Sequence, residues 1–389
     1  MSGVLVGPFV YAQTQSVPPD NDTCQTCHAD PSMVRADGRP ALVRADAFTA
    51  SVHGVLGCVD CHADLASAAE FPHPERLARV SCRSCHDEPA AGLAGSVHGM
   101  LSGAAALQCT SCHGAPHQIR PSSDFESPTY KLQIAGTCGQ CHGGLAGPGA
   151  RRGPAVAGLF ADSIHAVALE RTTVAPTCTD CHRSHDILRR TDAKSPVHPP
   201  NIPATCGACH GEQRRLFGAS VHAAQLAAGN AGAPQCASCH TAHRMAATAS
   251  DEWQLAAVEQ CGTCHREALA TYRDSVHGQV TALGFTPVAK CADCHESHQV
   301  HPVSDARSSV STQNRLTTCR ACHPAATANF VQFQPHANKE DPERSPELYY
   351  AALFMDGLLI GVFLFFGAHT LLWFVRERND SSAEEERRA

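Results

Sequence analysis

The sequence predicts a mostly irregular fold with short α-helices and one transmembrane helix near the C-terminus. Three observations support this prediction. The 389 residues include only 14 Phe, 5 Tyr and 2 Trp but 29 Gly and 25 Pro, which leaves few large side chains for an ordinary hydrophobic core. The alternating apolar pattern of β-strands is nearly absent. Residues 349–375 form a long apolar segment that suits a membrane-spanning helix.

The cysteines form one repeated motif. The chain has 22 Cys and 25 His, and every cysteine belongs to a C-x-x-C-H pentapeptide. The first cysteines of these motifs are Cys24, Cys58, Cys82, Cys109, Cys138, Cys178, Cys206, Cys236, Cys261, Cys291 and Cys319. The second cysteines are Cys27, Cys61, Cys85, Cys112, Cys141, Cys181, Cys209, Cys239, Cys264, Cys294 and Cys322. The histidines that end the motifs are His28, His62, His86, His113, His142, His182, His210, His240, His265, His295 and His323.

This spacing predicts covalent attachment of haem c. Two thiols three positions apart can form thioethers with the two vinyl groups of one haem, and the histidine that follows binds the iron. Zinc ribbons use pairs of C-x-x-C but do not need a histidine after every second cysteine. A disulfide framework has no reason to keep a fixed two-residue gap. We therefore expect eleven covalently bound haems, one for each motif.

The other histidines also follow a pattern. Five lie in the phrase S-[VI]-H-[GA], and we name these the S-x-H histidines: His53, His98, His165, His222 and His277. Four follow a haem motif closely, and we name these the second-set histidines: His117, His185, His243 and His298. Together with the motifs they define repeats of about 58 residues. Repeats 1 to 5 begin at Cys24, Cys82, Cys138, Cys206 and Cys261, and a half repeat begins at Cys319.

Two further histidines complete a set of distal ligands. The first repeat lacks a second-set histidine in CHADL, and His73 in FPHPER is its substitute, while His336 in QPHAN serves the half repeat. This makes eleven distal candidates for eleven motif histidines. Iron bound by two histidines has no open position for a substrate, which favours electron transfer. His198 competes with His185, and His301 with His298. The sequence leaves open which distal histidine serves which haem.

The expected haem domain, residues 13–345, is an elongated multihaem cytochrome c domain packed around its haems, in which each repeat packs on its neighbours. Short helices are expected at each motif and over residues 212–228. The Gly- and Pro-rich residues 143–158 lengthen the third repeat and are expected to form an exposed loop.

The ends of the chain predict export and anchoring. Residues 1–12 resemble the end of a secretory signal peptide, with cleavage after Ala12. Residues 346–376 are the predicted transmembrane helix, followed by a disordered cytoplasmic tail over 377–389. Arg376 and Arg378 mark its cytoplasmic side, so the haem domain is expected in the periplasm, on a single-pass protein of the inner membrane. His369 lies inside this helix and is expected to contact a haem b or quinone site of a partner, or to form a helix–helix hydrogen bond.

With its doubled C-x-x-C-H motifs, the sequence resembles the multihaem cytochrome c families over residues 24–336. These include class III-like cytochromes and membrane-anchored periplasmic cytochromes of respiratory chains. The resemblance implies an electron carrier between an integral membrane cytochrome b or quinol-oxidising subunit and periplasmic redox proteins or outer acceptors. The formal charge of −7 gives no reason to expect a nucleic-acid partner. The alternative is a multihaem reductase of nitrite, hydroxylamine or sulfur oxyanions, which would need one open haem. No C-x-x-C-K motif points to one.

Overall fold

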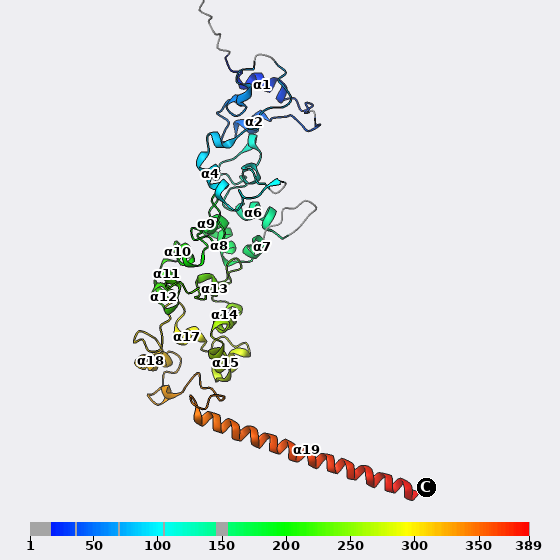
Figure 1. The fold of residues 1–389 in the computed structure, drawn as a ribbon, viewed down its shortest axis with the longest axis vertical. Coiled ribbons are helices and arrows are strands. Elements are labelled where there is room, and N and C mark those ends of the chain that lie inside the picture. Colours follow the sequence, from blue (N-terminus) through cyan, green and yellow to red (C-terminus); the bar gives the residue numbers. More distant parts are fainter. Residues whose placement is uncertain (1–16, 36, 69–70, 104–105, 145–154, 389) are drawn as a thin grey trace, which may run out of the picture. The chain divides into compact units, whose positions relative to one another are not determined.

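The computed structural model describes residues 17–35, 37–68, 71–103, 106–144 and 155–388, so the predicted signal remnant at 1–12 lies outside the described residues. In these ranges the regular structure consists of helices, with one isolated β-bridge between Val34 and Pro40 and no strand. Figure 1 shows this succession of short helices and long connections. The predicted fold class, irregular with short helices and one long C-terminal apolar helix, is confirmed.

The chain divides into two compact units. The first comprises Met1–Arg214 and Gly229–Ala247, and the second comprises Arg215–Ala228 and Thr248–Ala389. The helices of the first unit are α1 (Asn21–His28), α2 (Ala45–Thr49), α3 (Cys58–Cys61), α4 (Asp87–Gly95), α5 (Thr110–His113), α6 (Ile134–His142), α7 (Val156–Ala161), α8 (Ile164–Thr172), α9 (Cys178–His182), α10 (Ile202–Gly207) and α13 (Cys236–His240). Those of the second are α12 (Val221–Ala227), α14 (Asp251–Cys264), α15 (Arg266–Asp274), α16 (Val276–Ala282), α17 (Cys291–His295), α18 (Arg315–Arg320) and α19 (Pro346–Arg388). Helix α11 (Gly211–Gly218) includes residues of both units.

Large apolar side chains do not build the interior. Among the described residues, the buried hydrophobic side chains are Ala166, Leu169, Ile202, Val258, Tyr272 and Ala326. The largest fully buried side chains are serines. So small an apolar core agrees with the expectation that covalently attached cofactors supply most of the buried contacts.

The haem motifs start in helical turns, as expected. Each first cysteine lies in a helix, in the 3₁₀ turn Cys82–Ser84, or at the N-cap of one, as Cys109 does before α5. In three repeats the threonine just before the motif fixes it to the preceding loop through a hydrogen bond from its hydroxyl to a backbone carbonyl. These bonds are Thr137 to Pro128 (2.6 Å), Thr205 to Pro196 (2.7 Å) and Thr318 to Ser309 (2.6 Å).

The short helices expected over residues 212–228 are present as α11 and α12, and the Ser220 side chain caps the second of them. Two other segments differ from the sequence predictions. Helix α7 begins at Val156, inside the predicted loop 143–158, of which residues 145–154 lie outside the described residues. The tail predicted to be disordered is helical as far as Arg388, since it is rich in the helix formers Ala, Glu and Arg.

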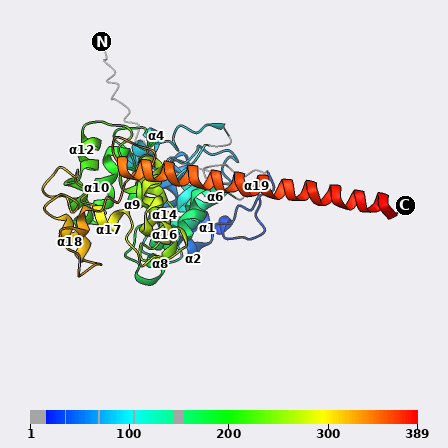
Figure 2. The same ribbon diagram turned by 90° about the horizontal axis from the view of Figure 1, so that it is seen from below.

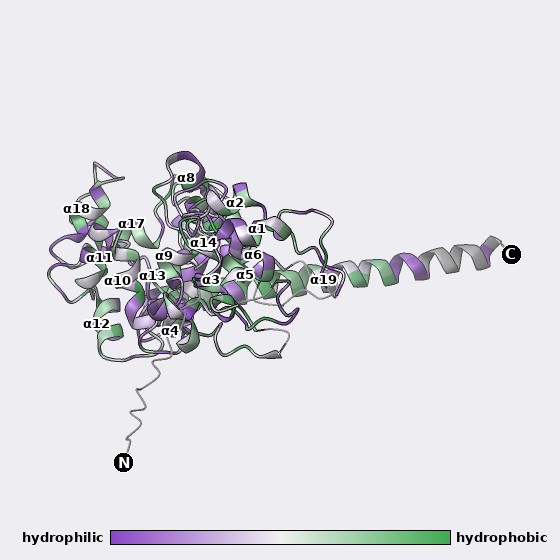
Figure 3. Cartoon of the chain, turned by 90° about the horizontal axis from the view of Figure 1, so that it is seen from above, coloured by the Kyte–Doolittle hydropathy of each residue, from purple (hydrophilic) through white to green (hydrophobic). Residues whose placement is uncertain are grey.

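Helix α19 is one continuous helix in both views (Figures 1 and 2). Within the described chain, Pro346–Asn379 is the one helix long and apolar enough to cross a membrane. Hydrophobic residues dominate the part that follows Pro346, as the colouring of Figure 3 shows. No described side chain of the rest of the protein covers its apolar stretch.

Candidate functional site

Histidine rings lie in pairs at a nearly constant distance. Ten pairs of imidazoles have ring centroids 6.0–6.4 Å apart, and each pair joins one motif histidine to one predicted distal histidine. The pairs are His28–His73, His53–His86, His62–His117, His98–His142, His113–His185, His165–His210, His182–His243, His222–His265, His277–His323 and His295–His336.

This distance fits one metal atom between each pair. A metal–imidazole nitrogen bond is about 2.0 Å long and the ring centre lies about 1.1 Å further on, so two imidazoles on opposite sides of one metal have centres about 6.2 Å apart. The two C-x-x-C thiols beside each motif histidine supply the covalent attachment. The residues present therefore fit haem c with two axial histidines.

The pairs follow a rule of exchange between neighbouring repeats. The first motif of a repeat pairs with the S-x-H histidine of the preceding repeat, as in His86–His53, His142–His98 and His210–His165. The same rule gives His265–His222 and His323–His277. The second motif pairs with the second-set histidine of the following repeat, as in His62–His117, His113–His185 and His182–His243. The geometry thus associates each of ten motif histidines with one distal candidate.

The two exceptions to the rule lie at the ends of the repeat array. Repeat 1 has no preceding repeat, and His28 pairs with His73 of its own repeat. Repeat 5 is followed only by half a repeat, and His295 pairs with His336.

His240 and His298 belong to different compact units. The spare histidines His198 and His301 occupy other environments. His198 points its Nδ1 at the carbonyl of Arg190 (3.0 Å), in a loop. His301 is buried, with 5% of its surface exposed, and its Nδ1 lies 3.9 Å from an Asp305 carboxylate oxygen. Its Nε2 has no hydrogen-bond partner among the described residues.

Serine caps position the S-x-H histidines. The serine hydroxyl accepts a hydrogen bond from the backbone N–H of the residue two or three positions later. This cap starts a helical turn that has the histidine at its second position. The donors are His53 for Ser51, His98 and Gly99 for Ser96, Ala166 for Ser163, Ala223 for Ser220 and Gly278 for Ser275. The small residue after the histidine is needed where the backbone is close: a Cβ on Gly278 would lie 2.0 Å from the carbonyl oxygen of Tyr272.

A backbone hydrogen bond joins each of four S-x-H phrases to the following repeat, and we name it the latch. The N–H of the residue between serine and histidine donates to the carbonyl two residues after a second-set histidine. The latches are Val52 to Ile119 (2.9 Å), Val97 to Ile187 (2.9 Å), Ile164 to Met245 (2.8 Å) and Val221 to Val300 (2.9 Å). The last of these puts His298, rather than His301, in register with the other second-set histidines.

A residue with a positive φ follows the second motif of four repeats. The residue after the motif histidine has φ near +60° to +80° and extended ψ, a region that only glycine adopts readily. It is glycine in Gly114 (φ 83°) but not in Arg183 (65°), Thr241 (62°) or Glu296 (64°). This sharp turn ends the motif helix and directs the chain toward the second-set histidine two to three residues later.

Motif thiols interact in an alternating order. Within a repeat the side chains of the two first cysteines are neighbours, in the pairs Cys24–Cys58, Cys82–Cys109, Cys138–Cys178, Cys206–Cys236 and Cys261–Cys291. Between repeats the second cysteines are neighbours, in the pairs Cys61–Cys85, Cys112–Cys141, Cys181–Cys209 and Cys294–Cys322. Burial and the neighbouring Cys24 thiol raise the pKa of Cys58 to about 11. Within each compact unit, consecutive motifs are therefore neighbours in sequence order.

The imidazoles are suited to metal binding. Burial lowers the pKa of motif histidines such as His62 and His182, and of distal candidates such as His117, His222 and His298. A lowered pKa favours the neutral imidazole, which is the form that binds metals.

Tautomers are fixed at the first pair. The Nδ1 atoms of His28 and His73 are bonded to the carbonyls of Ala41 and Pro74 (both 2.9 Å). Donation from Nδ1–H leaves Nε2 as the nitrogen that is free to bind the iron.

The other readings of the cysteines find no support in the geometry. All 22 cysteines are free of disulfides. No three His, Cys, Asp or Glu side chains of the described residues come together as they would around a zinc ion.

Comparison with known proteins points to the same class. The family model described as cytochrome c7 and related cytochrome c matches residues 45–114 and, a second time, residues 69–143. No curated protein and no solved structure matches the chain. The predicted resemblance to multihaem c-type cytochromes, which bind haem c covalently and transfer electrons, is thus confirmed over these motifs.

Proposed function

We propose that this chain is an electron carrier that holds eleven haems c, each iron bound by two histidines. The observation that carries the proposal is the set of ten imidazole pairs at 6.0–6.4 Å, each made of one motif histidine and one histidine from elsewhere in the chain. His298 is proposed as the eleventh distal ligand because its segment carries the same latch as those of His117, His185 and His243.

Haem iron, when bound, supplies reversible one-electron chemistry. The two imidazoles of each pair would fill both axial positions, which leaves no position for a substrate and argues for a carrier rather than an enzyme. The thiols would hold the porphyrins in a fixed order, because consecutive motifs are neighbours through Cys24 and Cys58, Cys61 and Cys85, and their equivalents. This order supports electron transfer from motif to motif within each compact unit.

We propose that α19 anchors the protein in the cytoplasmic membrane with the haem domain in the periplasm. Tyr349, Tyr350 and Trp373 stand where interfacial aromatic residues belong, and Arg376 follows on the cytoplasmic side. By the resemblance to membrane-anchored respiratory cytochromes, the partner would be a cytochrome b or another quinol-oxidising subunit. His369, within α19, is a candidate for contact with that subunit. Periplasmic redox proteins or outer acceptors would receive the electrons.

Haem counting and ligand binding test the proposal together. The protein made in a host that matures c-type cytochromes should carry eleven haems by mass and by the absorbance of the pyridine complex, and its reduced form should not bind carbon monoxide. Six or fewer haems would contradict the assignment of the motifs. Stoichiometric carbon monoxide binding to one haem would favour the alternative function, a multihaem reductase with one open site.

A further inference from the structure

One imidazole pair of the second compact unit takes its distal histidine from outside the five repeats. His295 pairs with His336, at a centroid distance of 6.2 Å. His336 lies in the segment that leads from the last motif to α19, which begins at Pro346. The distal candidate of this pair therefore comes from the segment next to the predicted membrane helix.

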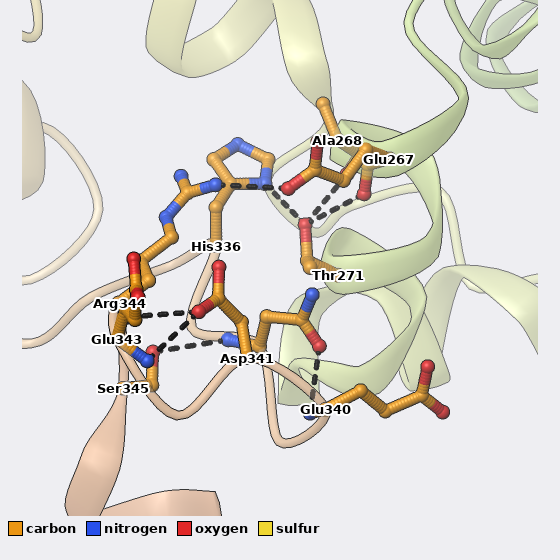
Figure 4. Close-up of polar contacts among 10 residues, drawn as sticks. Glu267, Ala268, Thr271, His336, Glu340, Asp341, Glu343, Arg344 and Ser345 are labelled. Carbon is orange, nitrogen blue, oxygen red and sulfur yellow. Dashed lines mark hydrogen bonds and ion pairs between the residues drawn. The ribbon is translucent and has the colours of Figure 1, made fainter.

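Hydrogen bonds hold this segment against α15 (Figure 4). The Nδ1 atom of His336 lies 3.0 Å from the hydroxyl oxygen of Thr271, which is buried. Further along, a guanidinium nitrogen of Arg344 lies 3.0 Å from a carboxylate oxygen of Glu267. Thr271 and Glu267 both belong to α15, which starts directly after the motif histidine His265.

Hydrogen bonds also fix this segment where it joins α19. Ser345 is buried, and its hydroxyl accepts a hydrogen bond from the N–H of Asn338 (3.2 Å). Its own N–H donates to the carbonyl of Asp341 and its carbonyl accepts from the N–H of Tyr349, both at 3.0 Å. Ser345 thus joins the turns after His336 to the first turn of α19. No free linker separates the His336 imidazole from the membrane helix.

The neighbouring pair differs in this respect. His277 and His323 hold the site of the last motif, and both come from the repeat array. Cys322 of that motif is a neighbour of Cys294, which belongs to the motif of His295. The site of His295 in turn contacts the preceding motif through Cys261 and Cys291.

We propose that electrons pass between the membrane partner and this chain at the site of His295 and His336. The inference rests on the proposed function and names its point of exchange. Oxidation of one quinol by the membrane partner releases two electrons and two protons. The electrons would reduce two ferric irons of this chain one after the other, and the protons would go to water. The site of His277 and His323 would then lie off the route from the membrane partner to the other motifs.

The test uses full-length protein in lipid vesicles and three matched His→Met variants: His336→Met, His277→Met and His73→Met. A methionine axial ligand keeps the iron six-coordinate but raises its reduction potential. Potentiometric titration should show that the reduction potential of one haem is raised in each variant. A rise of about 59 mV makes onward transfer of one electron about tenfold less favourable. The electron donor is a ruthenium–bipyridine photoreductant with an alkyl chain that confines it to the vesicle membrane.

We expect His336→Met to slow reduction of the remaining haems by about tenfold, and to slow it more than His277→Met or His73→Met does. An equal or larger slowing by His277→Met would overturn the proposal and move the exchange point to the last motif. A wild-type rate in His336→Met would overturn the proposal while leaving the electron carrier intact. If wild-type protein is reduced by dithionite but not by the membrane-confined donor, the proposed function fails as well.

If His336→Met does not retain its haem, Thr271→Val provides the second variant. It keeps the histidine and removes the hydroxyl that lies 3.0 Å from its Nδ1. Loss of this hydrogen bond makes the imidazole a weaker donor to iron and raises the potential of the same haem. The same slowing of membrane-driven reduction is expected, and an unchanged rate with a raised potential would overturn the proposal.

Discussion

Replacing Val221 with proline removes one latch and leaves the local backbone intact. Val221 is the first residue of α12, and its N–H donates to the carbonyl of Val300 at 2.9 Å. Proline is favoured at a first helical position, and Ser220 before it already has the extended backbone (ψ 160°) that proline requires. Val276 is the matched control: it begins α16 after Ser275 (ψ 159°), and no latch acceptor for it exists in the described part of the chain.

The magnitude follows from the difference between the two variants. A single intramolecular hydrogen bond contributes about 0.5–1.5 kcal/mol to stability. Proline at a compatible position stabilises by about 0.4–1 kcal/mol through the unfolded chain, and this gain is common to both variants. We therefore expect the free energy of unfolding of Val221→Pro to be lower than that of Val276→Pro by about 1 kcal/mol. This corresponds to a change of about fivefold in the unfolding equilibrium.

The assay is equilibrium unfolding of the haem-loaded protein in guanidinium chloride and detergent, followed by haem absorbance and far-UV circular dichroism. Both positions lie in the second compact unit, so the same transition reports on both. Equal unfolding free energies for the two variants would show that the latch contributes nothing. A less stable Val276→Pro variant would refute the reasoning about the backbone.

Three other predictions concern the turns, the ligands and the anchor. Glu296→Gly should stabilise the fold by about 1 kcal/mol, because relief of a φ of 64° outweighs the entropy of glycine, and Gly114→Ala should destabilise it; thermal unfolding of both variants checks this, and a lower melting temperature for Glu296→Gly or a higher one for Gly114→Ala would refute it. His185→Ala should convert one haem to the high-spin form, visible in the absorption and electron paramagnetic resonance spectra, whereas His198→Ala should leave the spectra unchanged. Deleting residues 346–389 should move the cytochrome to the soluble fraction, and continued membrane retention would show that a second anchor exists.

The motifs could be predicted from the sequence because their chemistry is local. A C-x-x-C-H pentapeptide carries its own cysteines and histidine in five residues, and the repeat singles out the other histidines that recur with it. The apolar helix α19 could be predicted equally well, since membrane helices are specified by composition over one continuous segment.

The pairing of ligands could not be predicted, because it depends on contacts between repeats. His98 precedes the motif at Cys109 by only eleven residues, yet its ring faces His142 of the next repeat. Proximity in the sequence was therefore a poor guide. The preference for His185 over His198 likewise became visible only when the latch from Val97 to Ile187 placed the second-set segment.

The serine of the S-x-H phrase was the missed signal. Ser96, Ser163 and Ser220 are almost fully buried and cap the turns that carry the histidines. A serine two residues before an expected ligand, in every repeat, is the pattern of a helix cap. Recognised as such, it would have predicted helices beginning at Ile164 and Val221.

The exchange of histidines between neighbouring repeats limits how such a gene can change in length. Removal of one whole period from the middle of the chain would bring together an S-x-H phrase and a motif that already match, so donors and acceptors would stay equal in number. Under the proposed ligation, removal of half a period would leave motif histidines next to the deletion without a distal histidine. Families built in this way should therefore grow and shrink by two cofactors at a time, with His73 and His336 retained as terminators.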